Sequence, residues 1–201
     1  MGKPPLPVPH WPGSGPLTIP EDGLLVFSLD TACTQNRDRA RQLVRSALRE
    51  VLAPLLGCTL AAVPLIAESG QPLRLAGLES EIGLSVSHET GLSLVAIHLN
   101  GAVGVDLLRV AGMSMNGNEV LRLATDYLGT GVASRLASLP EAARRQAFAE
   151  AWVGLEAGLK CLGEGLRECS PERQVLLANC RIRELALPAG LIGAVALRIL
   201  P

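Results

Sequence analysis

The chain has 201 residues, enough for one domain or two small ones, and 48% of them are hydrophobic, so it can bury a core. The formal net charge of −1 argues against binding to nucleic acid or to an anionic membrane through bulk charge. The five cysteines are scattered without C-x-x-C spacing, which argues against a disulfide framework or a zinc site, so we expect reduced thiols in a cytosolic protein.

The first 22 residues are rich in proline and glycine and lack the apolar segment of a signal peptide. We expect residues 1–22 to be an extended arm that wraps the domain or stays mobile. The chain has no run of about 18 apolar residues, so no transmembrane helix is expected.

A strand is predicted at 23–30 and a long helix at 36–57, with Gly57 as its C-terminal stop. One face of this helix is apolar and carries Leu43, Ala47, Val51 and Leu55. Another carries a ladder of arginines at positions 37, 41, 45 and 49. Such a ladder is usually a solvated face; the functional alternative is a binding surface for nucleotide phosphates.

Several short strands are predicted next, near 63–67 and at 82–88, 92–99 and 102–108, with a turn at 68–73. Asn100–Gly101 is a strong two-residue signal for a hairpin between the last two strands.

The second half of the chain is predicted to begin with helices and to end with strands. Helices are expected at 115–129 and 131–139, and Pro140 opens a longer one. A closing pair of strands is expected at 174–185 and 191–200. This order predicts an α+β fold whose second half loosely repeats the first.

The stretch 151–166 is predicted to be helical, with an unusual distribution of charge. One apolar stripe consists of Leu155, Leu159, Leu162 and Leu166. A second stripe, rotated by roughly 90°, consists of Trp152, Glu156, Lys160 and Gly163. The face opposite the leucines is small: Gly154, Ala157, Gly158 and Cys161. We therefore expect an enclosed helix with one polar edge facing a cleft. The alternative is an ordinary i, i+4 pair between Glu156 and Lys160.

Asp106 is the second carboxylate that stands out, because it lies in a predicted strand. Val103, Val105 and Leu107 would share the core face of that strand. Gly104 and Asp106 would share the other, where the missing side chain of Gly104 leaves room for a ligand. Asp106 and Glu156 together would supply two oxygen ligands of the kind that magnesium takes from proteins. The alternative for Asp106 is a strand-end carboxylate that caps a loop.

Ser87 and His88 end the strand predicted at 82–88. Adjacent residues of a strand point to opposite faces, and the chain has no G-x-S-x-G motif, so a serine-hydrolase pair is disfavoured. His88 fits a contact to a phosphate or carboxylate better; the alternative is an ordinary half-buried histidine.

Taken together, these segments resemble the 4′-phosphopantetheinyl transferase family, of the larger, duplicated, monomeric type. That family combines a Gly-x-Pro turn, a Ser-His strand end, a Gly-Val-Asp strand and a helix of the form W-x-x-K-E-[AS]-x-x-K-x-x-G. From about residue 36 onward this chain has Gly70–Gln71–Pro72, Ser87–His88, Gly104–Val105–Asp106, and Trp152, Glu156, Ala157, Lys160 and Gly163. Departures from the pattern are Leu155 and Gln71, where lysine is usual, and Leu108, where a second acid is frequent.

The resemblance implies two similar α/β subdomains related by pseudo-two-fold symmetry, at 23–110 and 111–201. It implies a monomeric cytoplasmic enzyme that transfers the 4′-phosphopantetheine arm of coenzyme A to a serine of an acyl or peptidyl carrier protein. The by-product would be adenosine 3′,5′-bisphosphate. Such enzymes serve fatty acid, polyketide and nonribosomal peptide biosynthesis, and neither nucleic acid nor membrane is an implied partner.

The resemblance also implies roles for the acidic and basic residues of the second half. Asp106 and Glu156 would hold Mg²⁺, and Glu156 would be the general base for the carrier serine. Lys160 would contact the transferred phosphate.

Coenzyme A would be bound by residues of the first half. His88, helped by Arg41, would bind its 3′-phosphate, and Ser87 would assist through its hydroxyl or backbone. Arg74 would replace the charge missing at Gln71.

Two other functions compete with this one. A non-catalytic relative would bind coenzyme A or a carrier protein without transfer, and the three departures favour it. A structural α+β domain would bind no small ligand at all.

Overall fold

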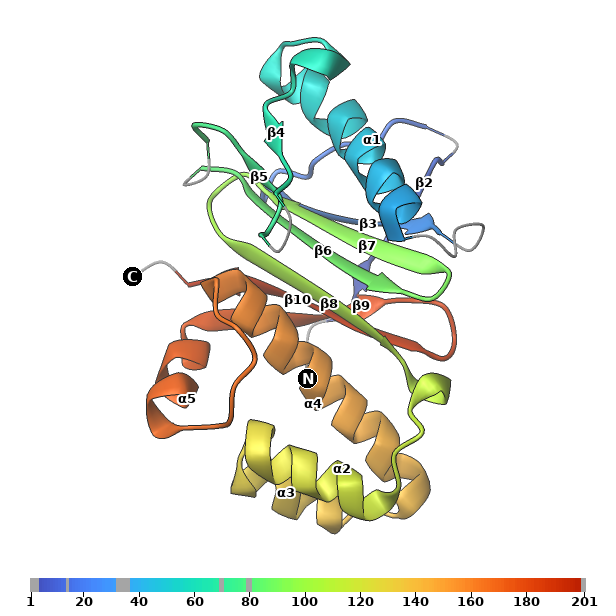
Figure 1. Ribbon diagram of the computed structural model, residues 1–201, viewed down its shortest axis with the longest axis vertical. Coiled ribbons are helices and arrows are strands. Elements are labelled where there is room, and N and C mark those ends of the chain that lie inside the picture. The colour runs from blue at the N-terminus through green and yellow to red at the C-terminus, as the bar shows by residue number, and fades with distance from the viewer. Residues whose placement is uncertain (1–3, 14, 32–36, 69–70, 79–80, 200–201) are drawn as a thin grey trace. The chain divides into compact units, whose positions relative to one another are not determined.

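A computed structural model describes residues 4–13, 15–31, 37–68, 71–78 and 81–199 of the chain (Figure 1). The fold is α+β. Its contacts divide the chain into two compact units. The N-terminal unit is Pro7–Val103, and the C-terminal unit is Gly104–Pro201 together with Met1–Leu6. The division therefore falls at residue 103, whereas the sequence suggested residue 110.

The N-terminal unit is built on a four-stranded sheet with strand order β2-β3-β7-β6. The strands are β2 (His10–Trp11), β3 (Leu24–Asp30), β6 (Gly83–Glu89) and β7 (Leu92–His98). β2 runs parallel to β3, and the other neighbours are antiparallel. The predicted strands 23–30, 82–88 and 92–99 are confirmed to within one residue at each end. All of β7 is buried, as expected for a strand inside a sheet.

The predicted long helix is α1 (Arg37–Leu56). It ends at Gly57, which has a φ of 60°. The Cys58 N–H donates to the Ala53 carbonyl at 3.0 Å, and the Gly57 N–H donates to Pro54. This is a Schellman motif, so the predicted glycine stop is confirmed. The elements that follow are η1 (Leu60–Ala62), β4 (Leu65–Ile66) and β5 (Arg74–Leu75), and β4 and β5 pair antiparallel.

The buried face of α1 contains Ala47 and Val51, as predicted, but it does not extend to Leu55. Leu55 is 43% exposed, whereas Val44, Leu48 and Leu52 are almost fully buried in the core of this unit. The predicted positions are four residues apart, so each step rotates by about 40° and the stripe drifts off the core. The buried positions 44, 47, 48, 51 and 52 combine steps of three and four residues, which keeps them on one face.

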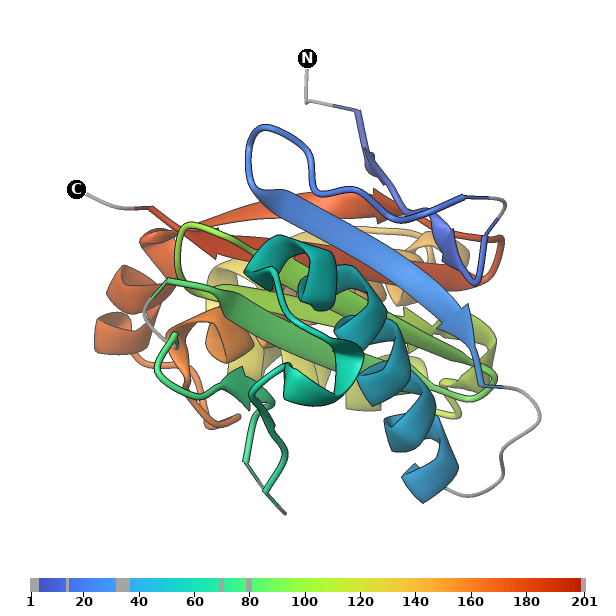
Figure 2. The same cartoon turned by 90° about the horizontal axis from the view of Figure 1, so that it is seen from above.

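The described part of the predicted N-terminal arm is packed: Leu6–Pro7 form β1 in the sheet of the C-terminal unit, and residues after Pro7 pack on the N-terminal unit. His10 and Trp11 add the parallel strand β2 beside β3 (Figure 2). The Trp11 indole donates to Glu50 Oε2 at 3.0 Å. Leu17 and Ile19 pack against the core. Hydrogen bonds and apolar contacts thus hold the described part of the arm in place.

The predicted hairpin at Asn100–Gly101 is wrong. β7 pairs with β3 and β6, whereas β8 (Val103–Arg109) belongs to another sheet. The hairpin is formed instead by β6 and β7, whose two-residue turn contains Gly91 at a φ of 86°. Glycine-containing turns determine where a chain can reverse, but they do not choose which strands pair.

The C-terminal unit has a four-stranded sheet with the order β1-β9-β10-β8. Its other strands are β1 (Leu6–Pro7), β9 (Cys180–Ala186) and β10 (Leu191–Arg198). Its helices are η2 (Val110–Gly112), α2 (Gly117–Leu123), the π-helical η3 (Ala124–Leu128), α3 (Thr130–Ala137), α4 (Glu141–Leu162) and α5 (Pro171–Ala178). The helices predicted at 115–129, 131–139 and after Pro140 are confirmed, although α2 passes into a π-helix.

The segment predicted as a strand at 174–185 is helical in its first half. Ser170 caps α5 by accepting a hydrogen bond from the Arg173 N–H at 3.3 Å, and Pro171 occupies the first turn. This serine–proline start signal outweighs the apolar residues that suggested a strand. β9 follows and pairs antiparallel with β10, so the closing pair of strands is confirmed from residue 180 onward.

No helix among the described ranges is both long enough and apolar enough to cross a membrane. The longest is α4, with 22 residues, and its sequence mixes charged residues with apolar ones.

Candidate functional site

The polar edge predicted for α4 is present. From Trp152 to Lys160, the half-exposed positions are Trp152, Glu156 and Lys160, and the six residues between them are buried. The small face predicted opposite the leucines is buried as well. Leu166 does not belong to the leucine stripe, because the helix ends at Gly163 with a φ of 70° and Leu166 is 43% exposed. The helix therefore carries both charges on one accessible edge.

Gly104 explains how closely β8 and α4 approach. A Cβ atom at this position would overlap the Ala157 carbonyl oxygen and lie 2.5 Å from the Cys161 nitrogen. The space beside Gly104 is thus filled by the backbone of α4, and the prediction that it leaves room for a ligand is wrong. Both faces of β8 are covered, since residues 103–107 are all buried. A glycine in a strand interior often marks such a close approach of backbones.

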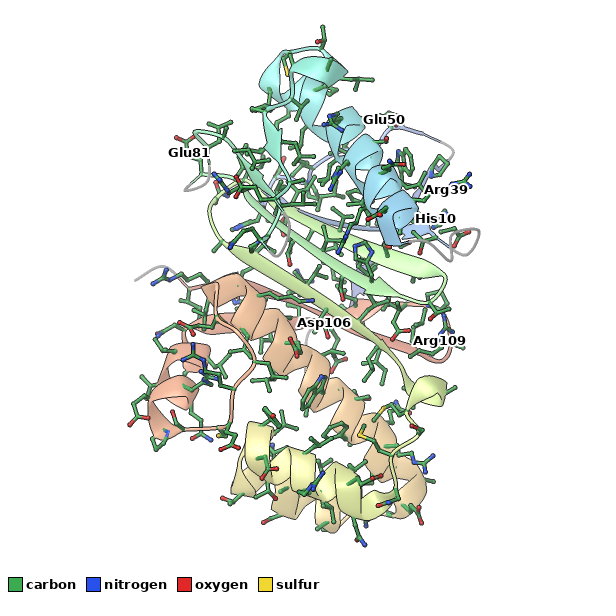
Figure 3. All side chains as sticks on the ribbon, viewed as in Figure 1. His10, Arg39, Glu50, Glu81, Asp106 and Arg109 are labelled. Carbon is green, nitrogen blue, oxygen red and sulfur yellow. The ribbon has the colours of Figure 1, made fainter. Side chains whose placement is uncertain are left out.

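This approach brings Asp106 to the polar edge of α4 (Figure 3). The Lys160 ammonium donates to Asp106 Oδ1 at 2.7 Å and to the Val105 carbonyl oxygen at 3.1 Å. Asp106 is 9% exposed, so this ion pair is shielded from water more than a surface pair. The simple i, i+4 interpretation is wrong, because Lys160 forms its ion pair with Asp106 and not with Glu156.

Glu156 lies within electrostatic reach of both partners. Burial raises the pKa of its carboxyl group, and the negative charge of Asp106 raises it further. The ammonium of Lys160 opposes both effects. The three groups therefore form one cluster, with two acids and a single base.

The donor set of this cluster suits a hard cation. Within the part of the chain that the structure describes, no group of three or more His, Cys, Asp and Glu side chains is placed to hold a metal ion. Asp106 on β8 and Glu156 on α4 could each offer one carboxylate, and two carboxylates are a partial ligand set of the kind that Mg²⁺ completes with water and substrate phosphates. The ammonium on Asp106 shows that this position already attracts a cation.

Ser87 and His88 point to opposite faces of β6, as predicted. Ser87 is buried and His88 is exposed. The Nδ1 atom of His88 lies 2.7 Å from the hydroxyl of Ser93, not from Ser87. Ser93 was not among the residues predicted from the sequence; its signal is a polar residue next to a run of apolar residues in a buried strand.

The two candidate arginines are paired with acids of their own neighbourhood. Arg41 contacts Asp38 at 3.3 Å on the exposed surface of α1. Arg74, in β5, contacts Glu68 at 3.6 Å. In the predicted Gly-x-Pro turn, Gly70 lies outside the described residues. All of these residues, with Ser87 and His88, belong to the N-terminal unit, whereas Asp106, Glu156 and Lys160 belong to the C-terminal unit.

A cavity of about 350 Å³ lies within the C-terminal unit, lined by residues of η3, α3, α4, α5 and β9. Leu155, Leu177 and Ile182 supply apolar surface. Its volume lies in the range of small-ligand sites. Leu155, which stands where the family pattern has lysine, thus contributes to an apolar wall. The sequence did not reveal this cavity, because its residues come from five separate elements.

Four cysteines fall within the described residues, namely Cys58, Cys161, Cys169 and Cys180, and all four are free thiols. Cys33 lies outside the described residues. Burial raises the pKa of Cys161 to about 12, so its thiol stays protonated at neutral pH.

No family model matches the chain, and a search of curated proteins finds no match.

Proposed function

We propose that this protein is a monomeric, cytoplasmic 4′-phosphopantetheinyl transferase, which moves the phosphopantetheine arm of coenzyme A onto a serine of an acyl or peptidyl carrier protein. The observation that carries the proposal is the cluster of Asp106, Glu156 and Lys160. The family pattern draws these residues from two separate motifs. In an unrelated α+β domain, nothing would require the acid of a Gly-Val-Asp strand to meet the polar edge of this helix.

The proposed fold consists of two similar α/β subdomains related by a pseudo-two-fold axis. In support, each unit has a four-stranded sheet and one long helix, of 20 residues in α1 and 22 in α4. The C-terminal unit adds α2, α3 and α5 to this plan.

Asp106 and Glu156 would hold Mg²⁺ in the proposed enzyme. The ion would offset negative charge on the pyrophosphate of coenzyme A. Lys160 lies at the same edge of α4 and would turn from Asp106 toward the transferred phosphate. An ammonium there neutralises charge on the phosphoryl group that moves.

Glu156 would accept the proton of the carrier serine. The serine oxygen attacks the phosphorus that bears pantetheine, and the bond from this phosphorus to the bridging oxygen breaks. Adenosine 3′,5′-bisphosphate leaves with that oxygen. The raised pKa of Glu156 moves its carboxylate toward the basicity that proton abstraction near neutral pH requires.

The N-terminal unit would recognise the nucleotide part of coenzyme A. His88 is exposed and can donate to the 3′-phosphate, whereas Ser87, buried on the opposite face of β6, would assist through its backbone. Arg41 and Arg74 would add positive charge by exchanging the carboxylates of Asp38 and Glu68 for phosphate.

The proposal is tested by incubating the protein with apo carrier proteins, coenzyme A and Mg²⁺ and measuring the mass of each carrier. A gain of one phosphopantetheine group is expected with at least one carrier of an acyl and peptidyl panel. Asp106→Asn and Glu156→Gln should each reduce the rate about 100-fold or more. Arg122→Met changes an exposed cation of α2 and is the matched control. Full activity in the Asp106 or Glu156 variant would overturn the assignment of the site.

A non-catalytic coenzyme A or carrier-binding protein is the second candidate. Two observations favour it. Lys160 forms an ion pair with Asp106, and Leu155 lies in the apolar wall of the cavity. Calorimetric binding of coenzyme A without any mass gain on the carriers would select this function. Absence of binding to both ligands would select a structural domain.

A further inference from the structure

One face of the N-terminal sheet is made of residues that pair across β3, β7 and β6. Two successive rows are apolar: Leu25–Ile97–Leu84 and Phe27–Val95–Val86. They belong to the core that α1 covers. The next row on the same face is Leu29–Ser93–His88. Two of its three residues are polar, although the two preceding rows are entirely apolar.

Ser93 is completely buried, with an exposure of 0%. Its hydroxyl lies 2.7 Å from Nδ1 of His88 and 3.5 Å from the hydroxyl of Thr31, which is itself 5% exposed. A buried hydroxyl costs free energy unless it is hydrogen-bonded, and an apolar residue would fill the same position in a strand without that requirement. The hydroxyl of Ser93 therefore serves hydrogen bonding and not packing, and its shorter contact is the one to Nδ1 of His88.

We propose that Ser93 is a positioning residue for coenzyme A: together with Thr31 it fixes the ring of His88 through Nδ1, so that Nε2 is presented to the 3′-phosphate. The inference rests on the proposed function and adds to it a residue that no sequence motif contains. An imidazole has two nitrogen atoms. The hydrogen-bond partner of one nitrogen determines the tautomer of the ring and the direction in which the other nitrogen points. Without the hydroxyl, the ring of His88 would lose the 2.7 Å contact that orients Nδ1.

The decisive measurement compares coenzyme A with 3′-dephospho-coenzyme A by calorimetry. The wild-type protein should bind coenzyme A more tightly. Ser93→Ala should weaken binding of coenzyme A about 5- to 10-fold, the effect of one oriented hydrogen bond to a charged group, and should leave the dephospho compound unaffected. Ser93→Thr retains the hydroxyl and should retain most of the difference. Ser28→Ala is the matched control, because Ser28 is a buried serine of β3 whose hydroxyl contacts the Pro9 carbonyl and His10 Nδ1 instead of His88.

A second readout does not need any ligand. The chain has three histidines, so the ring nitrogens of His88 can be assigned in ¹⁵N spectra with the aid of His10→Asn and His98→Asn. Ser93→Ala should shift the Nδ1 resonance of His88, and Thr31→Val should shift it in the same direction. If Ser93→Ala does not fold, Thr31→Val carries both measurements.

The outcomes separate the inference from the proposed function. If the wild type distinguishes the two compounds and the hydroxyl variants do so equally well, Ser93 has no positioning role. Unchanged ¹⁵N resonances in both variants would overturn the inference whatever the protein binds. If the wild type binds neither compound, the proposed function fails, and with it the role of Ser93 toward coenzyme A.

Discussion

The ammonium of Lys160 lies 2.7 Å from Oδ1 of Asp106, although 54 residues separate the two in the chain. The same ammonium also donates to the Val105 carbonyl, so it is anchored on β8 by two bonds. A divalent ion at Asp106 must therefore compete with a positive charge that is already in place. This relationship determines how the candidate site should respond to substitution.

Lys160→Met should increase the affinity for divalent ions. Removing a competing cation within a few ångström of the carboxylates should strengthen Mn²⁺ or Mg²⁺ binding by about 10-fold, while transfer activity falls. Isothermal calorimetry measures the affinity directly. Arg122→Met should leave it unchanged, and Asp106→Asn should abolish it. An unaltered affinity in Lys160→Met would show that the lysine does not occupy the metal position.

Glu156→Gln should make the protein more stable at neutral pH. Because the folded state raises the pKa of this carboxyl group, it holds the proton more tightly than the unfolded chain does. The free energy of unfolding therefore falls as the pH rises from the ordinary pKa of 4.5 through the raised value. The amide has no such penalty, so Tm should rise on the order of 2 °C near neutral pH.

Calorimetric scans at several pH values test the sign of this effect. The gain in Tm should shrink as the pH falls toward about 4.5, where the wild-type carboxyl is protonated in the folded state. Glu150→Gln, an exposed glutamate of the same helix, should change Tm little. A gain that grows toward acid pH would contradict the assigned direction.

Gly104→Ala should destabilise the C-terminal unit severely. The added Cβ collides with the backbone of α4 at Ala157 and Cys161, which cannot rotate away as a side chain does. We expect a loss of about 3 kcal/mol or more, or an insoluble protein. Chemical denaturation measures it. Gly112→Ala is the matched control, since a Cβ there meets nothing within 4 Å, and its stability should stay close to that of the wild type.

Ser170→Ala should weaken α5. The serine side chain satisfies the Arg173 N–H, so its removal should cost about 1 kcal/mol of stability. Ser134→Ala, an exposed position inside α3, should cost nothing and serves as the control. Hydrogen exchange at the first amides of α5 should accelerate only in the Ser170 variant. Equal protection in both would mean that the cap does not stabilise this helix.

Local patterns predicted much of the fold. The strands predicted at 23–30, 82–88 and 92–99 match β3, β6 and β7 to within a residue, and Gly57 correctly ended α1. The charge distribution on α4 predicted its single half-exposed edge at Glu156 and Lys160. These features depend on hydrogen bonds and side-chain spacing within one element, which the sequence of that element contains.

Local sequence patterns thus identified most of the elements and the residues of the candidate site, but not α5 or the hairpin of β6 and β7. Tertiary structure alone decided that β8 leaves the sheet of β7, that Gly104 admits a helix backbone and not a ligand, and that Lys160 pairs with Asp106. Ser93 likewise became visible only through its cross-strand neighbour His88. Such relationships join residues far apart in the chain, and burial of whole elements selects them, so no local propensity can specify them.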